Sequence, residues 1–147
     1  PHPIYPTLEF RICDCCTRLN DAIGIAALIQ ALVAKLIILR ESNQTWRTYR
    51  GSLIHENKWR ATKSGIDSNL LDLGKNKEVS YKDLIYEMLE FINDVIDELG
   101  TKKHFTAIED IINNGSSADR QLAIFNKSNN LNKVVDHLIK ETALDCN

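Results

Sequence analysis

The chain has 147 residues, of which 44% are hydrophobic and 26% charged, and its formal net charge is −2. This length and composition are typical of one folded domain and exclude a wholly disordered chain. Positive and negative side chains are scattered along the sequence, so there is no basic stripe that could neutralise the phosphates of a nucleic acid. We therefore expect no nucleic-acid partner.

The first predicted element is a strand at residues 6–14, where polar and apolar side chains alternate. Because successive side chains of a strand point to opposite faces, Glu9 and Arg11 emerge side by side. The pattern alone favours a solvated ion pair that contributes well under about 1 kcal/mol. A strand that leads straight into an apolar helix, however, is expected inside a large molecule. There the two charges need partners, and a metal ion with an anionic substrate would supply them.

The second predicted element is a long apolar helix over residues 22–39, which begins at Asn20 or Asp21 and has Arg40 at its negative end. Its length raises the question of a membrane span. Lys35 lies deep in this short run and would be costly in lipid, whereas a helix that is apolar all round is also typical of the centre of a large soluble protein. We expect no membrane partner.

Residues 42–51 are polar and are predicted to form a loop. Ser52 is then predicted to cap a helix that runs to about Ser64 and is ended by Gly65. On this helix Asn57, Arg60 and either Lys63 or Ser64 share one face, and Glu56 can pair with Arg60. The pattern alone slightly favours a charged surface helix.

The rest of the chain is predicted to be helical apart from one turn at residues 72–77, which has short extended arms. Ser80 and Asp83 resemble a capping box that opens a helix ending at Gly100. Arg120 lies in the first turn of a later helix, where a tertiary salt bridge is favoured over an anion site. The three C-terminal helices are predicted at residues 104–114, 117–126 and 131–143.

Cysteine is not expected to bind metal. Cys13, Cys15 and Cys16 form a Cys-x-Cys-Cys pattern and Cys146 is distant, so there is no second knuckle of the kind structural zinc sites use. Reduced thiols in a cytoplasmic protein are the simplest account.

Four segments of the sequence also match known sequence motifs. They are Thr7-Leu8-Glu9-Phe10-Arg11-Ile12-Cys13-Asp14 with Thr17-Arg18, the run from Ala26 to Val33, Glu56-Asn57-Lys58-Trp59-Arg60-Ala61 with Gly65-Ile66, and Ala118-Asp119-Arg120-Gln121. In this order and spacing they closely resemble the bacterial glutamate-cysteine ligase type 2 family, also called the carboxylate-amine ligases. The resemblance covers nearly the whole chain.

The resemblance implies a fold similar to the catalytic domain of glutamine synthetase, which is α+β in the full protein. This chain would be the C-terminal segment of that domain, mostly α-helical with one N-terminal strand feeding the sheet. Within residues 1–147, residues 1–65 would hold the active-site strand and buried helices, and residues 66–147 would form a helical cap.

The implied reaction is the ATP-dependent joining of glutamate to an amine such as cysteine, through an acyl phosphate, as in glutathione biosynthesis. By the resemblance, Glu9 is a Mg²⁺ ligand and Arg11 holds glutamate or its acyl phosphate. Asn57 and Arg60 would bind substrate or nucleotide. Lys63 stands where the family more often has arginine, and it keeps the charge but loses the planar fork of donors.

The chain begins with Pro1, and we expect an upstream part of the same protein to supply most of the sheet, the nucleotide pocket and the remaining metal ligands. The isolated segment is then expected to be inactive. The large apolar helix and the incomplete sheet also predict that the segment does not exist alone, and we expect a homo-oligomer. The alternative is a non-catalytic helical interaction module, or an inactive fragment, that kept the family scaffold.

Overall fold

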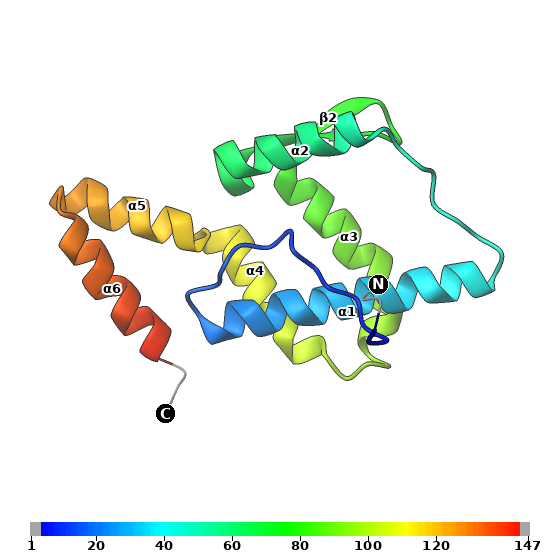
Figure 1. Cartoon of the computed structure of the whole chain (residues 1–147), viewed down its shortest axis with the longest axis horizontal. Coiled ribbons are helices and arrows are strands. Elements are labelled where there is room, and N and C mark those ends of the chain that lie inside the picture. The colour runs from blue at the N-terminus through cyan, green and yellow to red at the C-terminus, as the bar shows by residue number, and fades with distance from the viewer. Residues whose placement is uncertain (1–3, 145–147) are drawn as a thin grey trace.

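The computed structural model describes residues 4–144, and most of them are helical (Figure 1). This confirms the expectation of a mostly helical segment. The helices are α1 (Leu19–Glu41), α2 (Gly51–Ser64), α3 (Tyr81–Ile96), α4 (Phe105–Asn114), α5 (Ser117–Ser128) and α6 (Leu131–Ala143), with short 3-10 turns at Gly65–Asp67 and Lys102–His104.

The described residues contain one sheet, a hairpin of two antiparallel strands, β1 (Asn69–Asp72) and β2 (Lys77–Ser80). In its register, Asn69 pairs with Ser80 and Asp72 with Lys77. The Asp72 carboxylate accepts hydrogen bonds from the backbone N–H of Gly74 (3.0 Å) and of Lys75 (2.9 Å), which closes the turn. The predicted turn with two short extended arms is therefore confirmed.

The predicted N-terminal strand is not formed among the described residues. Residues 7–11 have no regular secondary structure, and the described part of the chain offers them no neighbouring strand. The apolar side chains of Leu8 and Phe10 are 56% and 49% exposed. Since a strand exists only through hydrogen bonds to a partner, a sheet fed by residues 6–14 stays a prediction.

Most helix boundaries agree with those predicted from the sequence, whereas the start of α2 and the end of α3 differ from the prediction. The N-cap of α3 is Ser80, whose hydroxyl accepts from the N–H of Asp83 (3.1 Å), as predicted. The N-cap of α2, however, is Arg50, which makes no side-chain cap, so the predicted cap at Ser52 is wrong by two residues. Helix α3 ends at Ile96, and the chain reaches Gly100 through a turn.

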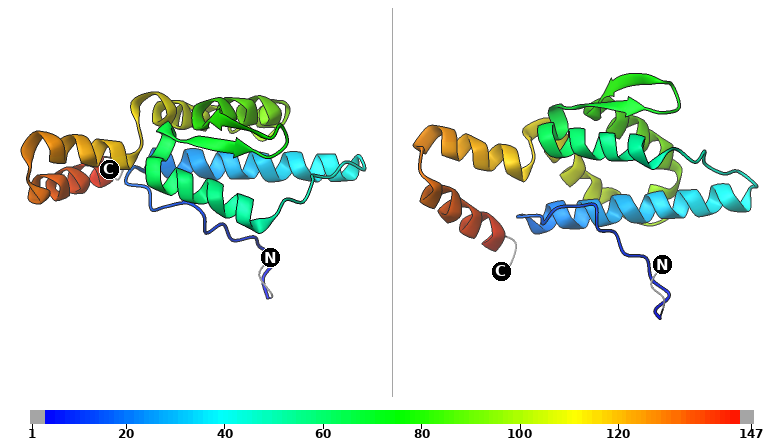
Figure 2. Two further views of the ribbon diagram at one scale, coloured as in Figure 1. Left: turned by 90° about the horizontal axis from the view of Figure 1, so that it is seen from above. Right: turned by 45° about the horizontal axis from the view of Figure 1, so that its top comes forward.

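The core lies where α1, α3 and α4 meet (Figure 2). Small residues on α1 allow close packing: Ala27 and Ala31 are buried, and a Cβ on Gly24 would lie only 2.9 Å from the Cβ of Ala107 on α4. The buried apolar residues of this core are Ala27, Ala31, Ile92, Val95, Ile96 and Phe105.

Helix α1 is less buried than its composition predicts. The Lys35 ammonium group pairs with Asp94 of α3 (2.5 Å), but Leu36, Ile37 and Ile38 are each at least 40% exposed. By length and composition alone, α1 is the one helix among residues 4–144 that could cross a membrane, a test that core helices of soluble proteins also pass. It contacts α3 and α4, and 17% of its most apolar 18-residue window is buried.

The remaining elements lie on either side of this core. Helix α2 packs on β1 and has no buried residue, unlike the buried helix expected in the first 65 residues. Helices α5 and α6 form an antiparallel pair that projects from the far end of the molecule (Figure 1). Polar side chains of the α5–α6 pair bond to residues at the start of α1.

Candidate functional site

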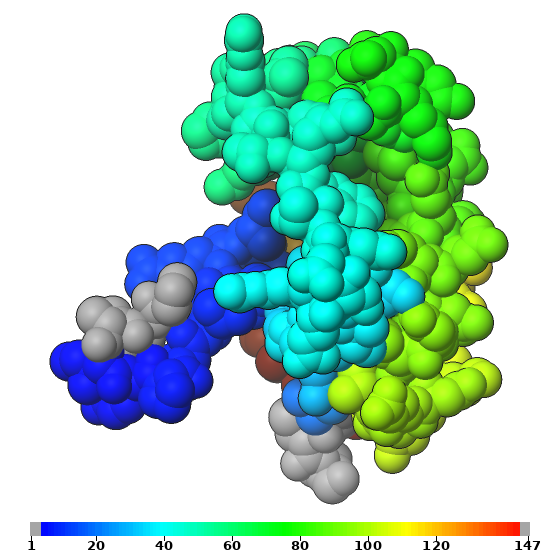
Figure 3. Space-filling model, turned by 90° about the vertical axis from the view of Figure 1, so that its right-hand side faces the viewer, coloured from blue at the N-terminus to red at the C-terminus, as the bar shows by residue number. Residues whose placement is uncertain are grey.

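Glu9 and Arg11, the two residues expected to carry the chemistry, face each other on the segment before α1. The Arg11 guanidinium donates to both carboxylate oxygens of Glu9, at 2.8 Å and 2.9 Å. The two side chains are 60% (Glu9) and 81% (Arg11) exposed, and this segment projects from the side of the molecule (Figure 3). In this structure the pair is therefore solvated, with its charges available to a ligand at the cost of a weak surface contact.

A cluster of polar side chains holds the end of this segment against the C-terminal helices. We call it the Glu141 cluster, and it consists of Thr17, Arg18, Asp21, Arg120 and Glu141. The Thr17 hydroxyl donates to Glu141 Oε2 (2.5 Å), while Glu141 Oε1 accepts from Arg18 Nε (2.9 Å) and Arg120 Nε (2.6 Å). Glu141 is only 2% exposed, so a buried carboxylate on α6 receives donors from two other parts of the chain.

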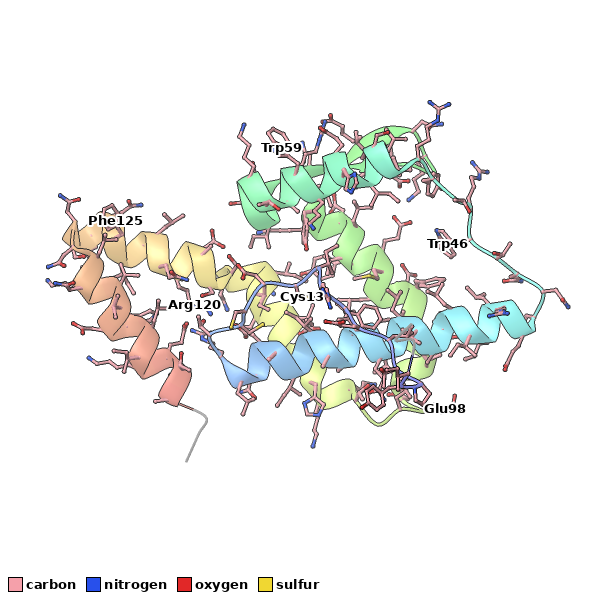
Figure 4. All side chains as sticks on the ribbon, in the orientation of Figure 1. Cys13, Trp46, Trp59, Glu98, Arg120 and Phe125 are labelled. Carbon is pink, nitrogen blue, oxygen red and sulfur yellow. The ribbon has the colours of Figure 1, made fainter. Side chains whose placement is uncertain are left out.

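Arg120 uses the planar fork of its guanidinium to join three elements. Besides Glu141, it donates to Asp21 Oδ2 on α1 (3.3 Å) and to the carbonyl oxygen of Gly115 (3.2 Å). Figure 4 shows Arg120 on α5 beside the turn that leads into α1. The predicted tertiary salt bridge of Arg120 is thus confirmed, and its neighbour Asp119 completes a capping box with Ser116.

The cluster explains a strong shift of the Glu141 pKa. Burial by itself raises the pKa of a carboxyl group, but the hydrogen bonds from Thr17 and Arg120 and the positive charges of Arg120 and Arg18 outweigh it, and the pKa falls to about 2. Glu141 is therefore ionised at neutral pH despite its burial.

Two of the predicted binding residues on α2 bond to the β1–β2 hairpin. Asn57 Nδ2 donates to the carbonyl oxygen of Leu71 (2.9 Å), and Asn57 Oδ1 accepts from the Leu71 N–H (2.7 Å). Arg60 pairs with Glu56 (2.8 Å) and with Glu78 on β2 (2.9 Å). The hydrogen bonds to these two carboxylates raise the pKa of Arg60.

The third predicted residue of this helix, Lys63, lies with its ammonium group 4.8 Å from the centre of the Trp59 ring. This is a cation–π contact at an exposed site, worth about 0.5–1 kcal/mol. Trp59 is 55% exposed and so does not belong to the core in this structure.

Within residues 4–144, no hydrogen bond or ion pair joins the predicted residues Glu9 and Arg11 to those on α2. Glu9 and Arg11 pair with each other, and the polar partners of Asn57 and Arg60 lie on α2 and the hairpin. Two cavities of about 290 and 300 Å³ lie at opposite ends of α1, and none of the predicted site residues lines either of them.

The described residues offer only part of a magnesium site. Within the described range, no group of three His, Cys, Asp or Glu side chains could hold a metal ion. Glu9 offers one hard carboxylate ligand, which suits Mg²⁺, but a complete site needs further oxygen ligands. Glu9 can therefore be one member of a magnesium site and not the whole of it.

Sequence reasoning missed Glu141 as a member of a cluster. A signal was present, because Glu141 follows the buried Val134 by seven residues and so lies on the same face of α6. An acidic residue on an inward face requires a partner, and Arg120 and Arg18 are the cations that provide it.

Comparisons with known proteins agree with these motifs. The family model for glutamate-cysteine ligase family 2 matches residues 1–137. Relatives named "Putative glutamate--cysteine ligase 2" include those of Solibacter usitatus (51% identical), Roseiflexus sp. (50%) and Sorangium cellulosum (42%). Each alignment covers 97–98% of this chain and 37–38% of the relative, so the chain spans well under half of their length. No solved structure matches the chain. The chain belongs to the glutamate-cysteine ligase family 2.

Proposed function

We propose that the protein carrying this chain is an ATP-dependent carboxylate-amine ligase that joins glutamate to cysteine or a similar small amine. The observation that carries the proposal is the family match over residues 1–137, within which Glu9 and Arg11 lie exposed and side by side. The proposal includes a glutamine synthetase-like fold for the complete protein, a homo-oligomeric state, and cytoplasmic glutathione biosynthesis.

The proposed reaction has two steps. The side-chain carboxylate of glutamate attacks the terminal phosphate of ATP, and ADP leaves with the electrons of the broken P–O bond. The amine then attacks the acyl phosphate, loses a proton and displaces inorganic phosphate, which leaves the γ-glutamyl amide. Phosphoryl transfer of this kind requires positive charge around the moving group more than covalent chemistry from the protein.

In this proposal the ion pair between Arg11 and Glu9 breaks. The Arg11 guanidinium then donates hydrogen bonds to the glutamate carboxylate and the acyl phosphate. Glu9, released from the same pair, would be one ligand of Mg²⁺, which would supply positive charge beside the phosphate oxygens. Asn57, Arg60 and Lys63 remain proposed contacts to substrate or nucleotide, and Asn57 and Arg60 would have to exchange hairpin contacts for them.

The test is ADP release by the complete protein supplied with Mg²⁺, ATP and glutamate, with and without cysteine. Arg11→Ala should lower cysteine-dependent ADP release by about 100-fold or more, because the charge that stabilises the transferring phosphoryl group is lost. The folding of the variant should be unchanged, since the Arg11 side chain is 81% exposed.

Lys102→Ala is the matched control. Lys102 forms a similarly exposed ion pair with Asp97, with side chains 76% and 70% exposed, at a site with no proposed role. Its ADP release should equal that of the parent protein. No ADP release by the folded parent protein with any amine would overturn the ligase and favour the non-catalytic interaction module.

A further inference from the structure

Residues 6–17 carry Glu9 and Arg11, and within this segment only Thr17 forms hydrogen bonds to other elements of the described structure. Between residues 6 and 16, every hydrogen bond of the structure links residues at most two positions apart. Thr17 and Arg18 are the first residues after Arg11 that bond to distant parts of the chain. The direction in which the segment leaves the molecule is therefore set at Thr17.

Thr17 bonds to both helices of the projecting α5–α6 pair. Its hydroxyl donates to Glu141 Oε2 on α6 (2.5 Å) and lies 3.0 Å from the hydroxyl oxygen of Ser117 on α5. The Glu141 carboxylate cannot swing away, because its other oxygen accepts from Arg18 and from Arg120. The short Thr17 side chain thus donates to one oxygen of the buried Glu141 carboxylate, and the bonds to the other oxygen fix the orientation of that carboxylate.

We propose that Thr17 is a positioning residue for the ligase reaction, with the α5–α6 pair acting as a clamp that fixes the segment carrying Glu9 and Arg11. The inference rests on the proposed function, since it concerns where Arg11 meets the reacting groups. A displacement of about 1 Å at a reacting centre can cost about 100-fold in rate, so a hydroxyl six residues away can matter without touching substrate.

The test compares Thr17→Val with Thr17→Ser in the complete protein. Valine keeps the shape of threonine and loses the hydroxyl, so kcat for cysteine-dependent ADP release should fall by about tenfold or more while KM for ATP stays unchanged. Serine keeps the hydroxyl and should restore kcat to within about twofold of the parent value. Thr106→Val is the matched control, because the Thr106 hydroxyl only donates to the Lys103 carbonyl within its own helix start (3.0 Å).

A second readout does not depend on activity. Cys16, next to Thr17, is half-buried, and its pKa is raised by that burial and by the nearby Asp21 carboxylate, so its thiol should react slowly. Thr17→Val should make Cys16 react several-fold faster with iodoacetamide, measured by mass spectrometry of the Cys16 peptide. The exposed Cys13 and Cys15 serve as internal references, and their rates should not change.

The outcomes separate the two proposals. Faster Cys16 alkylation together with a lowered kcat that serine restores supports the positioning role. An unchanged kcat in Thr17→Val, or a fall that Thr17→Ser shares, overturns it. If the parent protein releases no ADP at all, the proposed ligase fails, and unchanged Cys16 alkylation in Thr17→Val would overturn the clamp separately.

Discussion

Asn57 acts on β1 as a neighbouring strand would. The backbone N–H and C=O of Leu71 both bond to the Asn57 side-chain amide, while Leu71 lies opposite Glu78 in the hairpin. The amide thus satisfies one residue's polar groups on the free edge of a two-stranded sheet, which would otherwise be marginally stable alone. A residue expected to bind a ligand has a structural role here.

Replacing Asn57 should therefore weaken the fold. Asn57→Ala removes both bonds to Leu71 and should lower the free energy of unfolding by about 1–3 kcal/mol. The measurement is urea unfolding of the chain. Asn93→Ala, on an exposed position of α3, is the control and should change stability by less than about 0.5 kcal/mol. Equal stability of the two variants would show that the two hydrogen bonds between Asn57 and Leu71 do not contribute to the free energy of unfolding.

Glu141 should make stability depend on acid. Its folded-state pKa of about 2 lies below the ordinary value of 4.5, so its stabilisation is fully present above pH 4.5 and is lost as the pH falls toward 2. Glu141→Gln should remove up to about 3 kcal/mol at neutral pH and flatten the loss of stability between these pH values.

The measurement is thermal unfolding from pH 2 to pH 7, with Glu98→Gln as the control. Glu98 is exposed on the surface near the end of α3, so its replacement should leave the acid profile unchanged. The other carboxylates with lowered pKa, Asp72, Asp94 and Asp119, are common to all three proteins. A parallel acid profile for Glu141→Gln and the parent chain would contradict the assigned pKa.

At the scale of elements, α1 and α4 approach closely because Gly24 has no side chain. A Cβ there would lie 2.9 Å from the Ala107 Cβ and 3.0 Å from the His104 carbonyl oxygen, and the backbone oxygen cannot easily move. Gly24→Ala should destabilise the chain by about 1–3 kcal/mol through this overlap, reduced by up to about 1 kcal/mol of better helix propensity.

Gly51→Ala is the matched control for the same substitution. Gly51 also lies in a helix, at the start of α2, and nothing lies within 4 Å of a Cβ built on it. Thermal unfolding should show a lower Tm for Gly24→Ala and an equal or higher Tm for Gly51→Ala. A raised Tm in both would mean that α1 and α4 separate without cost.

The elements that sequence predicts best are those whose signals are local. As predicted, Ser80 caps α3, a turn forms at residues 72–77, and α6 begins at Leu131 and ends at Ala143. Local side-chain bonds from Asp72 and Asn130 accompany the last two. The start of α2 has no such signal, because Arg50 offers no cap. Strand formation at residues 6–14 is non-local, because the alternation of side chains carries no information on whether a partner strand lies beside them.

At the scale of the whole molecule, the chain exposes apolar side chains that a complete core would cover. The composition of α1 predicts burial on all sides, yet α3 and α4 cover only part of it, and Ile37 remains 51% exposed. Burial of a helix depends on what surrounds it, and the chain spans 37% of its relative from Solibacter usitatus. The roles proposed for Glu9 and Arg11 rest on a local motif, whereas the burial of α1 depends on neighbours that are distant in sequence.

The bond between Thr17 and Glu141 also has a consequence for the order of folding. The two residues are 124 positions apart, so their contact closes a long loop and is costly in chain entropy. At ribosomal speeds of about 5–20 residues per second, Glu141 is made about 6–25 s after Thr17, long after α1 can form. The segment bearing Glu9 and Arg11 is therefore expected to be among the last parts of the chain to be fixed. A partly synthesised chain would form the apolar helix α1 before the position of Glu9 and Arg11 is set.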